Sequence, residues 1–335
     1  MSKEPTAPSA VTSADVARLA GVSRATVSFV LNNTQAHRVS EATRARVQEA
    51  AQQLGYVPHA AARSLRAGRS NLVLMPASVS AAGQLVAAWV DDLESELERH
   101  GYVLVLHAGR FADEVTAARA WAELRPVAVL ALDGDRMSGR AVEVLTRAGV
   151  RGVVAFGAYQ LPGAFTIGLD QAAIGALAAR HLIDRRRNTI GVVMPQERGL
   201  DTIARPRLEG AERTAGRSSA TVTPLDLSFS HESAAEVAAQ VRRLRIDGVF
   251  AYNDEYAALL VHALRAARLR VPADVCVIGC DDLVLSALQQ PPLTSVRLEL
   301  PTPAQVADAL HILIEGGTPP VVQPVEPVLV QRMST

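Results

Sequence analysis

From residue 71 to the C-terminus, short apolar runs rich in β-branched residues alternate with stretches of helical periodicity. No other feature constrains the fold as much, because strands that alternate with helices form parallel sheets covered by helices. The runs fall into two groups, which predicts an α/β core of two lobes. The predicted strands are 72–75, 102–107, 127–132 and 153–156 in the first group, and 189–194, 248–251 and 275–279 in the second.

The N-terminal sixty residues carry the different pattern of short amphipathic helices. Thr12 and Asp15 have the spacing of a capping box, a hydroxyl followed three residues on by a carboxylate, so a helix is predicted to begin there. The apolar positions expected to share one face of this helix are Val16, Leu19 and Ala20.

A turn and two more helices are predicted to follow. Gly21 allows the tight turn, Val22 is expected to point inward, and Ser23 is placed to cap a second helix over 24–31. A third helix is predicted from the cap Ser40 to Gly55. Helix, three-residue turn and helix are typical of a small all-α DNA-reading head, although αα-hairpins with a glycine turn also occur in other proteins.

The chain has no net charge, but its charges are unevenly distributed. Between residues 11 and 70, eight arginines stand against three carboxylates, so this segment carries +5 and the rest carries −5. A basic N-terminal module joined to an acidic body is typical of a DNA-binding protein with a second function behind the head. Lys3 is the only lysine, and arginine suits bidentate contacts to guanine and phosphate, although a coding bias would give the same preference.

The order of residues in the head is a more specific signal than the pattern of its predicted helices. The head reads VTSADVARLAGVSRATVS at 11–28 and VLN at 30–32, and the chain continues with GYVP at 55–58, ARSL at 62–65 and GRS at 68–70. The first set closely resembles the headpiece of the lac repressor/gal repressor (LacI/GalR) family, and the second resembles that family's hinge. The resemblance implies a sequence-specific DNA-binding transcriptional regulator, which we expect to be a repressor.

The resemblance also implies a domain organisation. The family core is similar to the periplasmic sugar-binding fold, in which strands cross between two lobes, here near Leu169 and Val296. A helix over 304–314 is expected to return to lobe one, and strands within 321–330 to lobe two. The expected parts are a disordered tail at 1–10, the headpiece at 11–58, a hinge helix at 59–70 and an effector-binding and dimerisation core at 71–335. Lobe one is expected at 71–168 and 298–317, and lobe two at 169–296 and 320–332.

The resemblance implies that residues of the second helix contact the major groove of DNA. The protein is expected to bind a near-palindromic operator as a homodimer. Arg24 is expected to read guanine, whose O6 and N7 atoms accept a bidentate guanidinium. Phe29 stands where the family commonly has arginine, and is expected to touch a thymine methyl or to pack. The six positions are Arg24, Ala25, Thr26, Ser28, Phe29 and Asn32; of these, Thr26, Ser28 and Asn32 are expected to touch phosphates or to cap.

The hinge segment places an apolar residue among arginines. Pro58 is expected to end the third helix, and a short helix over 60–67 would carry Arg63 and Arg66. Leu65 is either an ordinary packing residue or, as the resemblance implies, a wedge that enters the minor groove and kinks the DNA. His59 stands where the family often has a capping asparagine.

Polar residues that follow predicted strands are candidate effector ligands, because ligands of open α/β sheets bind at the carboxyl ends of strands. Arg207 lies in an RLEG run that resembles the family's arginine motif. Asp254 and Asp282 are expected to cap the helices that follow them. The candidates for a small polar, carbohydrate-like effector are Asp170, Arg207, Asn253 and Asp281.

Two departures from the family leave an alternative open. The first strand of the core ends in MPAS at 75–78, without the Asn-Pro-Phe type of segment, and aromatic residues make up only 4% of the chain. Sugar sites use aromatic faces for stacking, so the alternative is a repressor with a degenerate effector site.

Other classes are disfavoured. The sequence has no G-x-G-x-x-G, P-loop, G-x-S-x-G or H-E-x-x-H motif, which argues against an enzyme. Cys276 and Cys280 lack further ligands at metal spacing and are expected to be reduced and structural, so neither metal nor cofactor is predicted. No apolar run is long enough for a membrane span and no signal peptide is recognisable, which predicts a cytoplasmic protein rather than a free solute-binding protein.

Overall fold

A computed structural model describes residues 11–31, 39–57, 70–76, 83–109 and 111–335. The chain divides into two compact units, Met1–Ser70 and Asn71–Thr335. The predicted fold class, an all-α head followed by a two-lobed α/β core, is confirmed. The expected tail at 1–10 and most of the expected hinge at 59–70 lie outside the described residues.

The first unit contains the three predicted helices, α1 (Ser13–Ala20), α2 (Arg24–Leu31) and α3 (Glu41–Gln53). The predicted caps are confirmed. The Asp15 carboxylate accepts a hydrogen bond from the Thr12 backbone N–H at 2.9 Å. The Ser23 hydroxyl accepts from the Thr26 N–H at 3.1 Å, and the Ser40 hydroxyl accepts from the Thr43 N–H at 3.3 Å.

A small apolar core holds the three helices together. Val22 packs against it, as expected from the turn, and Gly21 has a φ of 65° in the left-handed region that glycine favours. Leu19 is 51% exposed, so its assignment to the buried face is wrong, and Ala17 is buried instead. The buried side chains are Val16, Ala17, Ala20, Val27, Val30, Val47, Ala50 and Ala51.

Lobe one of the second unit is built on a five-stranded parallel sheet. The strand order is β2 (Val103–Leu106), β1 (Leu72–Met75), β3 (Ala128–Ala131), β4 (Gly152–Gly157) and β5 (Phe165–Gly168). Apolar residues of α6 (Gln84–Arg99) and α14 (Pro303–Ile314) form one core cluster with the sheet. Residues of α7 (Glu114–Glu123) and α8 (Gly139–Arg147) form a second cluster.

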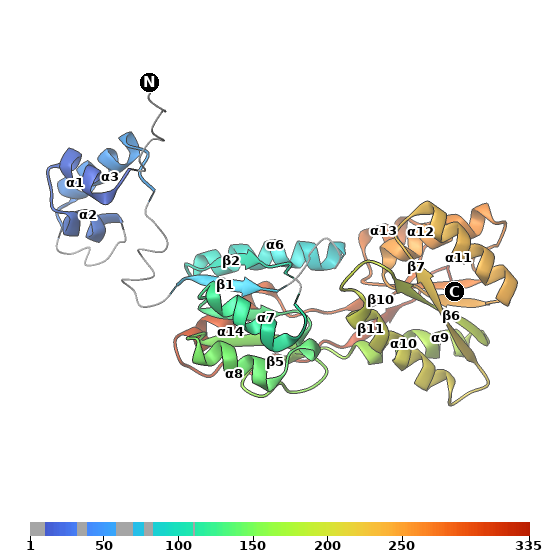
Figure 1. The fold of residues 1–335 in the computed structure, drawn as a ribbon. Helices are drawn as coiled ribbons and strands as arrows, with labels where there is room; N and C mark the ends of the chain where they lie inside the picture. Colours follow the sequence, from blue (N-terminus) through green and yellow to red (C-terminus); the bar gives the residue numbers. More distant parts are fainter. Residues whose placement is uncertain (1–10, 32–38, 58–69, 77–82, 110) are drawn as a thin grey trace, which may run out of the picture. The chain divides into compact units, whose positions relative to one another are not determined.

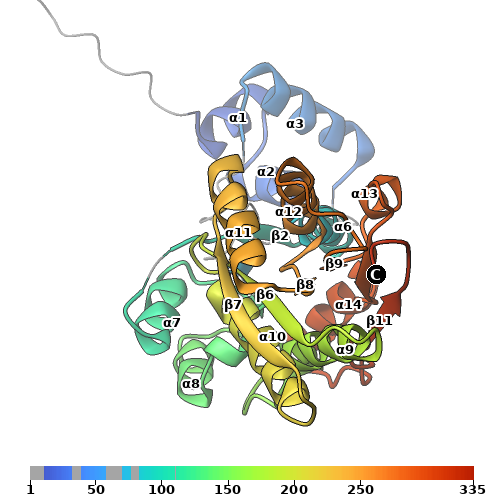
Figure 2. The same ribbon diagram turned by 90° about the vertical axis from the view of Figure 1, so that its right-hand side faces the viewer.

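Lobe two is built on a six-stranded sheet, parallel except for its last pair. The order is β11 (Pro327–Val330), β10 (Thr294–Leu298), β9 (Cys276–Cys280), β8 (Gly248–Phe250), β6 (Thr189–Pro195) and β7 (Thr221–Leu227), with β10 and β11 antiparallel. Figure 2 shows α11 (His231–Leu244) and α12 (Asp254–Ala266) on one side, and α9 (Gln171–Asp184) and α10 (Asp201–Ala215) on the other. A single apolar cluster fills this lobe.

The chain passes between the lobes after β5, after β10 and after α14. Leu169 leads from β5 to α9 and forms an isolated parallel bridge with Val325. After β10 the chain enters α14, which packs on lobe one, and β11 returns it to lobe two. Three connections therefore join the lobes and allow them to enclose a site between them.

Three strands, β5, β7 and β10, were not among the predicted ones, and none has the expected apolar run. β5 is only four residues long and ends in glycine. β7 reads TVTPLDL, alternates between exposed and buried positions, and contains Pro224. Such a pattern is typical of an edge strand, which is where β7 lies in the sheet.

Candidate functional site

The head exposes the N-terminal end of α2. Arg24 and Ala25 are exposed, and Thr26, Ser28 and Phe29 are partly exposed. The opposite face of α2 is buried in the head core through Val27 and Val30. Asn32 and the hinge candidates Arg63, Leu65 and Arg66 lie outside the described residues.

Arg24 differs from two other arginines of the head in its surroundings. Arg18 forms an ion pair with Asp15 at 2.8 Å, and Arg44 lies 3.9 Å from Glu41. Within the described part of the chain, no carboxylate forms an ion pair with Arg24. Arg24 lies at the exposed start of α2.

The core contains a cavity of about 1260 Å³ that residues of both lobes line. Three of the four candidate effector residues, Arg207, Asn253 and Asp281, lie in its wall. They come from α10, from the residue that precedes α12 and from the residue that follows β9. These positions are far apart in the sequence, and the carboxyl ends of parallel strands bring two of them to one edge of the sheet.

Arg207 is held on several sides. Its side chain is 5% exposed, and its Nε donates to Gln171 Oε1 at 2.8 Å. Its Nη1 donates to the backbone oxygen of Tyr252, and its guanidinium carbon lies 5.1 Å from the Tyr252 ring centroid. A buried arginine fixed in this way presents its remaining donors in a defined direction.

Asn253 both caps a helix and lines the cavity. Its Oδ1 accepts from the Tyr256 backbone N–H at 3.0 Å, which makes it the N-cap of α12. Its Nδ2 donates to Glu255 Oε2 at 3.1 Å. The cap and the ligand interpretations of this residue are therefore compatible.

Asp281 lies at the end of β9 in a strained conformation. Its φ is 96°, a value that residues other than glycine rarely adopt, and its N–H donates to Val296 O at 2.8 Å. Burial raises the pKa of its carboxyl to about 6, although the nearby Arg207 acts in the opposite direction. Backbone strain and a raised pKa at one cavity residue are typical of a functional position.

Asp170 lies elsewhere. Its carboxylate accepts from the backbone N–H groups of Ala172 and Ala173 and caps α9. The residue is exposed and does not belong to the cavity wall. Its place in the structure is that of a helix cap.

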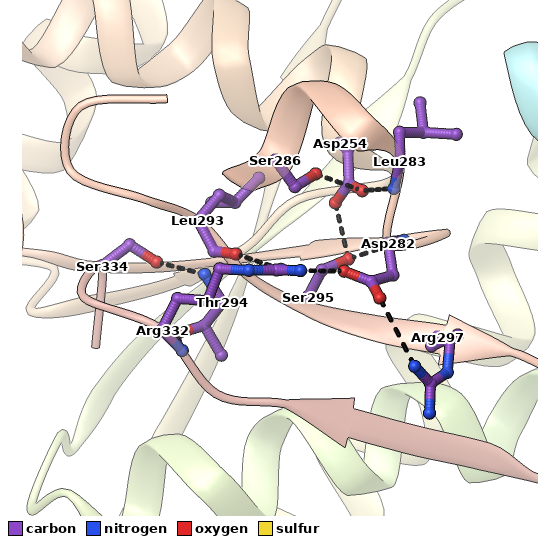
Figure 3. A network of polar contacts seen from close by, with 10 residues as sticks. All are labelled: Asp254, Asp282, Leu283, Ser286, Leu293, Thr294, Ser295, Arg297, Arg332 and Ser334. Atoms are coloured by element: carbon purple, nitrogen blue, oxygen red, sulfur yellow. Dashed lines mark hydrogen bonds and ion pairs between the residues drawn. The ribbon is translucent and has the colours of Figure 1, made fainter. Parts of the chain in front are cut away.

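The expectation that Asp254 and Asp282 cap the following helices is wrong. Asp254 is fully buried, and its carboxylate accepts from Leu283 N, Ser286 Oγ and Ser295 Oγ at 2.7, 2.6 and 2.6 Å (Figure 3). Asp282 pairs with Arg332 at 2.6 Å and lies 3.8 Å from Arg297 (Figure 3). The Asp254 carboxylate therefore joins β10 to the segment that follows Asp281. The Asp282 carboxylate joins that segment to Arg332 near the C-terminus.

The scarce aromatic residues are concentrated at the cavity. Both tryptophans of the chain line it, together with two phenylalanines and one tyrosine. The low aromatic content therefore does not deprive this site of ring faces. The aromatic lining residues are Trp89, Phe111, Trp121, Phe156 and Tyr252.

Sequence reasoning missed several lining residues. His107 follows β2, Asp133 is near the end of β3, and Glu197 is near the end of β6. Asp133 and Glu197 follow predicted strands and could have been found from that signal, whereas His107 was placed inside the predicted strand 102–107. Trp89 and Trp121 gave no such signal, since tryptophans on amphipathic helices are ordinary core residues.

The described residues contain neither a metal-binding cluster nor a membrane-spanning helix. No group of three or more His, Cys, Asp or Glu side chains in this part of the chain is arranged to hold a metal ion. No helix among the same residues is long and apolar enough to cross a membrane. Cys276 and Cys280 are buried and free.

A helix-turn-helix head followed by a two-lobed core with a ligand-sized cavity defines a ligand-responsive DNA-binding regulator. Residues 12–59 match the family described as bacterial regulatory proteins, lacI family, and residues 179–335 match the periplasmic binding protein-like domain. HTH-type transcriptional repressor PurR of Vibrio atlanticus is 31% identical over 310 residues, 90% of each chain. The ribose operon repressor of Escherichia coli is 31% identical over 341 residues, 96% of this chain and 98% of that protein. The chain belongs to the LacI family of transcriptional repressors, which are not enzymes.

Solved structures show the same architecture. The transcriptional regulator CelR in complex with cellobiose is 27% identical with a TM-score of 0.62, over 97% of this chain and 100% of that one. The lac repressor dimer bound to operator and the anti-inducer ONPF is 24% identical with a TM-score of 0.73, over 97% and 99%. At 24% identity, the likeness to the lac repressor shows that the two chains share a fold.

Proposed function

We propose that a small polar, hydroxyl-rich effector binds in the cavity through Arg207, Asn253 and Asp281 and controls the affinity of this repressor for its operator. The observation that carries the proposal is the convergence of these three side chains on one cavity of about 1260 Å³. A guanidinium, an amide and a carboxyl group offer both donors and acceptors, as hydroxyl groups require. Names of relatives support this class of ligand, among them a ribose operon repressor and a regulator in complex with cellobiose.

The cavity also provides a route for control. Both lobes line it, so a ligand that contacts both would favour the arrangement of lobes in which those contacts are best. A ligand shifts DNA affinity only by its differential binding to two arrangements, and about 1–3 kcal/mol of coupling is typical.

The DNA-binding state in this proposal is a homodimer on a near-palindromic operator. One recognition helix contacts too few bases for genomic specificity, whereas two heads read two half-sites. The lac repressor, whose fold this chain shares, was solved as a dimer bound to operator. Arg24 would read a base in each half-site, while Arg63, Leu65 and Arg66 would contact the minor groove between the heads. A regulator that acts on operator DNA in this way works in the cytoplasm.

Two experiments test the proposal. Selection of bound sequences from random DNA is expected to yield a near-palindrome. A metabolite panel measured by thermal shift is expected to identify a ligand that stabilises the wild-type protein and changes its affinity for that operator.

Variants then locate the site. Arg207→Ala and Asp281→Ala should lose the ligand-induced shift, whereas Asp170→Ala, which removes only a helix cap, should keep it. Equal stabilisation of all four proteins would place the ligand elsewhere. If no metabolite stabilises the wild type, the ligand-independent alternative is supported.

A further inference from the structure

Two consecutive aspartates at the end of β9 adopt a backbone conformation that few residues other than glycine occupy. Asp281 has a φ of 96° and Asp282 a φ of 51°, both in the left-handed region. Residues in such conformations persist only where surrounding contacts hold them. Because Asp281 lines the cavity, the contacts that hold this turn also decide where its carboxylate lies.

The main chain of the turn is fixed by three successive N–H groups, each of which has an acceptor in β10 or α12. The three bonds join Asp281 N to Val296 O at 2.8 Å, Asp282 N to Ser295 Oγ at 3.0 Å and Leu283 N to Asp254 Oδ2 at 2.7 Å. These bonds hold the backbone, but none of them fixes the carboxylate of Asp282.

The Asp282 carboxylate is fixed by a residue near the C-terminus. Arg332 Nη2 donates to Asp282 Oδ1 at 2.6 Å, and Arg332 Nη1 donates to Leu293 O at 2.8 Å (Figure 3). The paired side chains are 21% and 10% exposed, so water screens this charge-assisted bond only weakly. A second cation, Arg297, lies 3.8 Å from the same carboxylate and is 47% exposed. Arg332 is therefore the closer and better shielded partner.

Arg332 is itself held in place by contacts along its segment. Its backbone N–H donates to Thr294 Oγ1 at 2.9 Å. Two residues further on, the buried Ser334 hydroxyl donates to Val277 O at 2.6 Å and accepts from Thr294 N at 2.8 Å. We call residues 332–334 the C-terminal strap. The strap crosses β9 and β10, and its arginine reaches the turn that follows β9.

We propose that Arg332 is a positioning residue of the effector site. By pairing with Asp282, it holds the turn in its left-handed conformation and so directs the neighbouring Asp281 carboxylate into the cavity. The inference rests on the proposed function, because it assumes that Asp281 binds the effector. Arg332 does not line the cavity, so it acts through the turn and not on the ligand.

Amide hydrogen exchange of the full chain tests the turn without any ligand. Arg332→Met should raise the exchange rates of the Asp282 and Leu283 amides roughly tenfold, while the amides of β6 in the same lobe keep theirs. Arg332→Lys keeps the charge and should restore most of the protection. Arg297→Met is the matched control, because its distance and exposure predict an increase of less than about threefold.

Titration calorimetry then shows whether the turn acts through Asp281. The probes are D-ribose and cellobiose, the sugars that the names of two relatives contain. Arg332→Met should weaken whichever probe binds wild type by roughly tenfold, and should have no further effect in the Asp281→Asn background. A merely structural role would weaken binding equally in both backgrounds.

Unchanged exchange at Asp282 and Leu283 in Arg332→Met overturns the inference. An increase that extends equally to β6, or that Arg297→Met reproduces, overturns it as well. The same holds for an equal loss of affinity with and without the Asp281 carboxylate. If neither sugar binds wild type, exchange alone decides whether Arg332 holds the turn, and the metabolite panel separately decides the proposed function.

Discussion

Gly175 on α9 lies against the backbone carbonyl of Arg207 on α10 so closely that a Cβ atom at position 175 would be 1.8 Å from that oxygen. Gly210 is placed in the same way, since its Cβ would lie 1.9 Å from Ala172 O. The two glycines thus allow α9 and α10 to approach closely where Arg207 bonds to Gln171. Neither residue has a positive φ, so the neighbouring helix, and not a turn, requires glycine.

Gly175→Ala should separate α9 from α10 and displace Arg207. We expect a loss of about 1–3 kcal/mol in the free energy of unfolding, the usual effect of overpacking, together with weaker effector binding. Gly216→Ala is the control, because a Cβ there meets Glu212 O at an ordinary 3.4 Å. Chemical denaturation of both variants measures the difference, and equal stability would show that the helices adjust without cost.

Effector binding should depend on the ionisation of Asp281, whose pKa is raised to about 6 by burial. Below that pH the protonated carboxyl loses a charge-assisted acceptor, so affinity should fall by roughly tenfold per pH unit. Calorimetry at several pH values measures this. Asp281→Asn should remove the dependence, and a slope that persists in this variant would assign it to another group.

The same pKa determines the sign of a stability effect in the free protein. Because the pKa of Asp281 is raised from 3.8, the folded chain holds this proton more tightly than the unfolded chain between the two values. This group therefore makes the free energy of unfolding decrease as pH rises from about 4 to about 6, and contributes no further change above that. Subtraction of the Asp281→Asn curve from that of wild type isolates the contribution.

Asp254→Ala should destabilise lobe two by about 2–4 kcal/mol, because it leaves three donors, two of them on buried serines, without their acceptor. Asp274→Ala is the matched control, since it removes a carboxylate whose ion pair with Arg270 is exposed, and such pairs contribute about 0–1 kcal/mol. Thermal unfolding compares the two. A small effect of Asp254→Ala would mean that Ser286 and Ser295 find other acceptors.

Arg24→Ala should cost roughly 1–3 kcal/mol in operator binding and relax the preference at one base pair in each half-site. Arg63→Ala, in the hinge sequence, should instead weaken all DNA sequences similarly and reduce the salt slope by about one. Binding to operator and random DNA at several salt concentrations distinguishes the two. Equal losses of Arg24→Ala on both kinds of DNA would make it a phosphate contact.

Local sequence patterns were sufficient to predict helices and buried strands. Thr12, Ser23 and Ser40 were recognised as caps because the capping bond joins residues two or three positions apart, within the reach of a local pattern. Buried parallel strands such as β1 and β4 were recognised because both of their faces require apolar side chains. The edge strand β7 was missed because its exposed face interrupts that run.

Local sequence patterns were enough to identify the class of head, the alternation of strands and helices, and the residue types near strand ends. The role of each polar residue depended on how distant segments pack together. Asn253 and Asp254 are adjacent, yet the first caps α12 at the cavity and the second is buried against Leu283, Ser286 and Ser295. Side-chain direction depends on partners about 30 to 40 residues away, and a cavity exists only where both lobes contribute to its wall. Neither property is encoded in a local pattern, because both arise from packing between segments that are distant in the sequence.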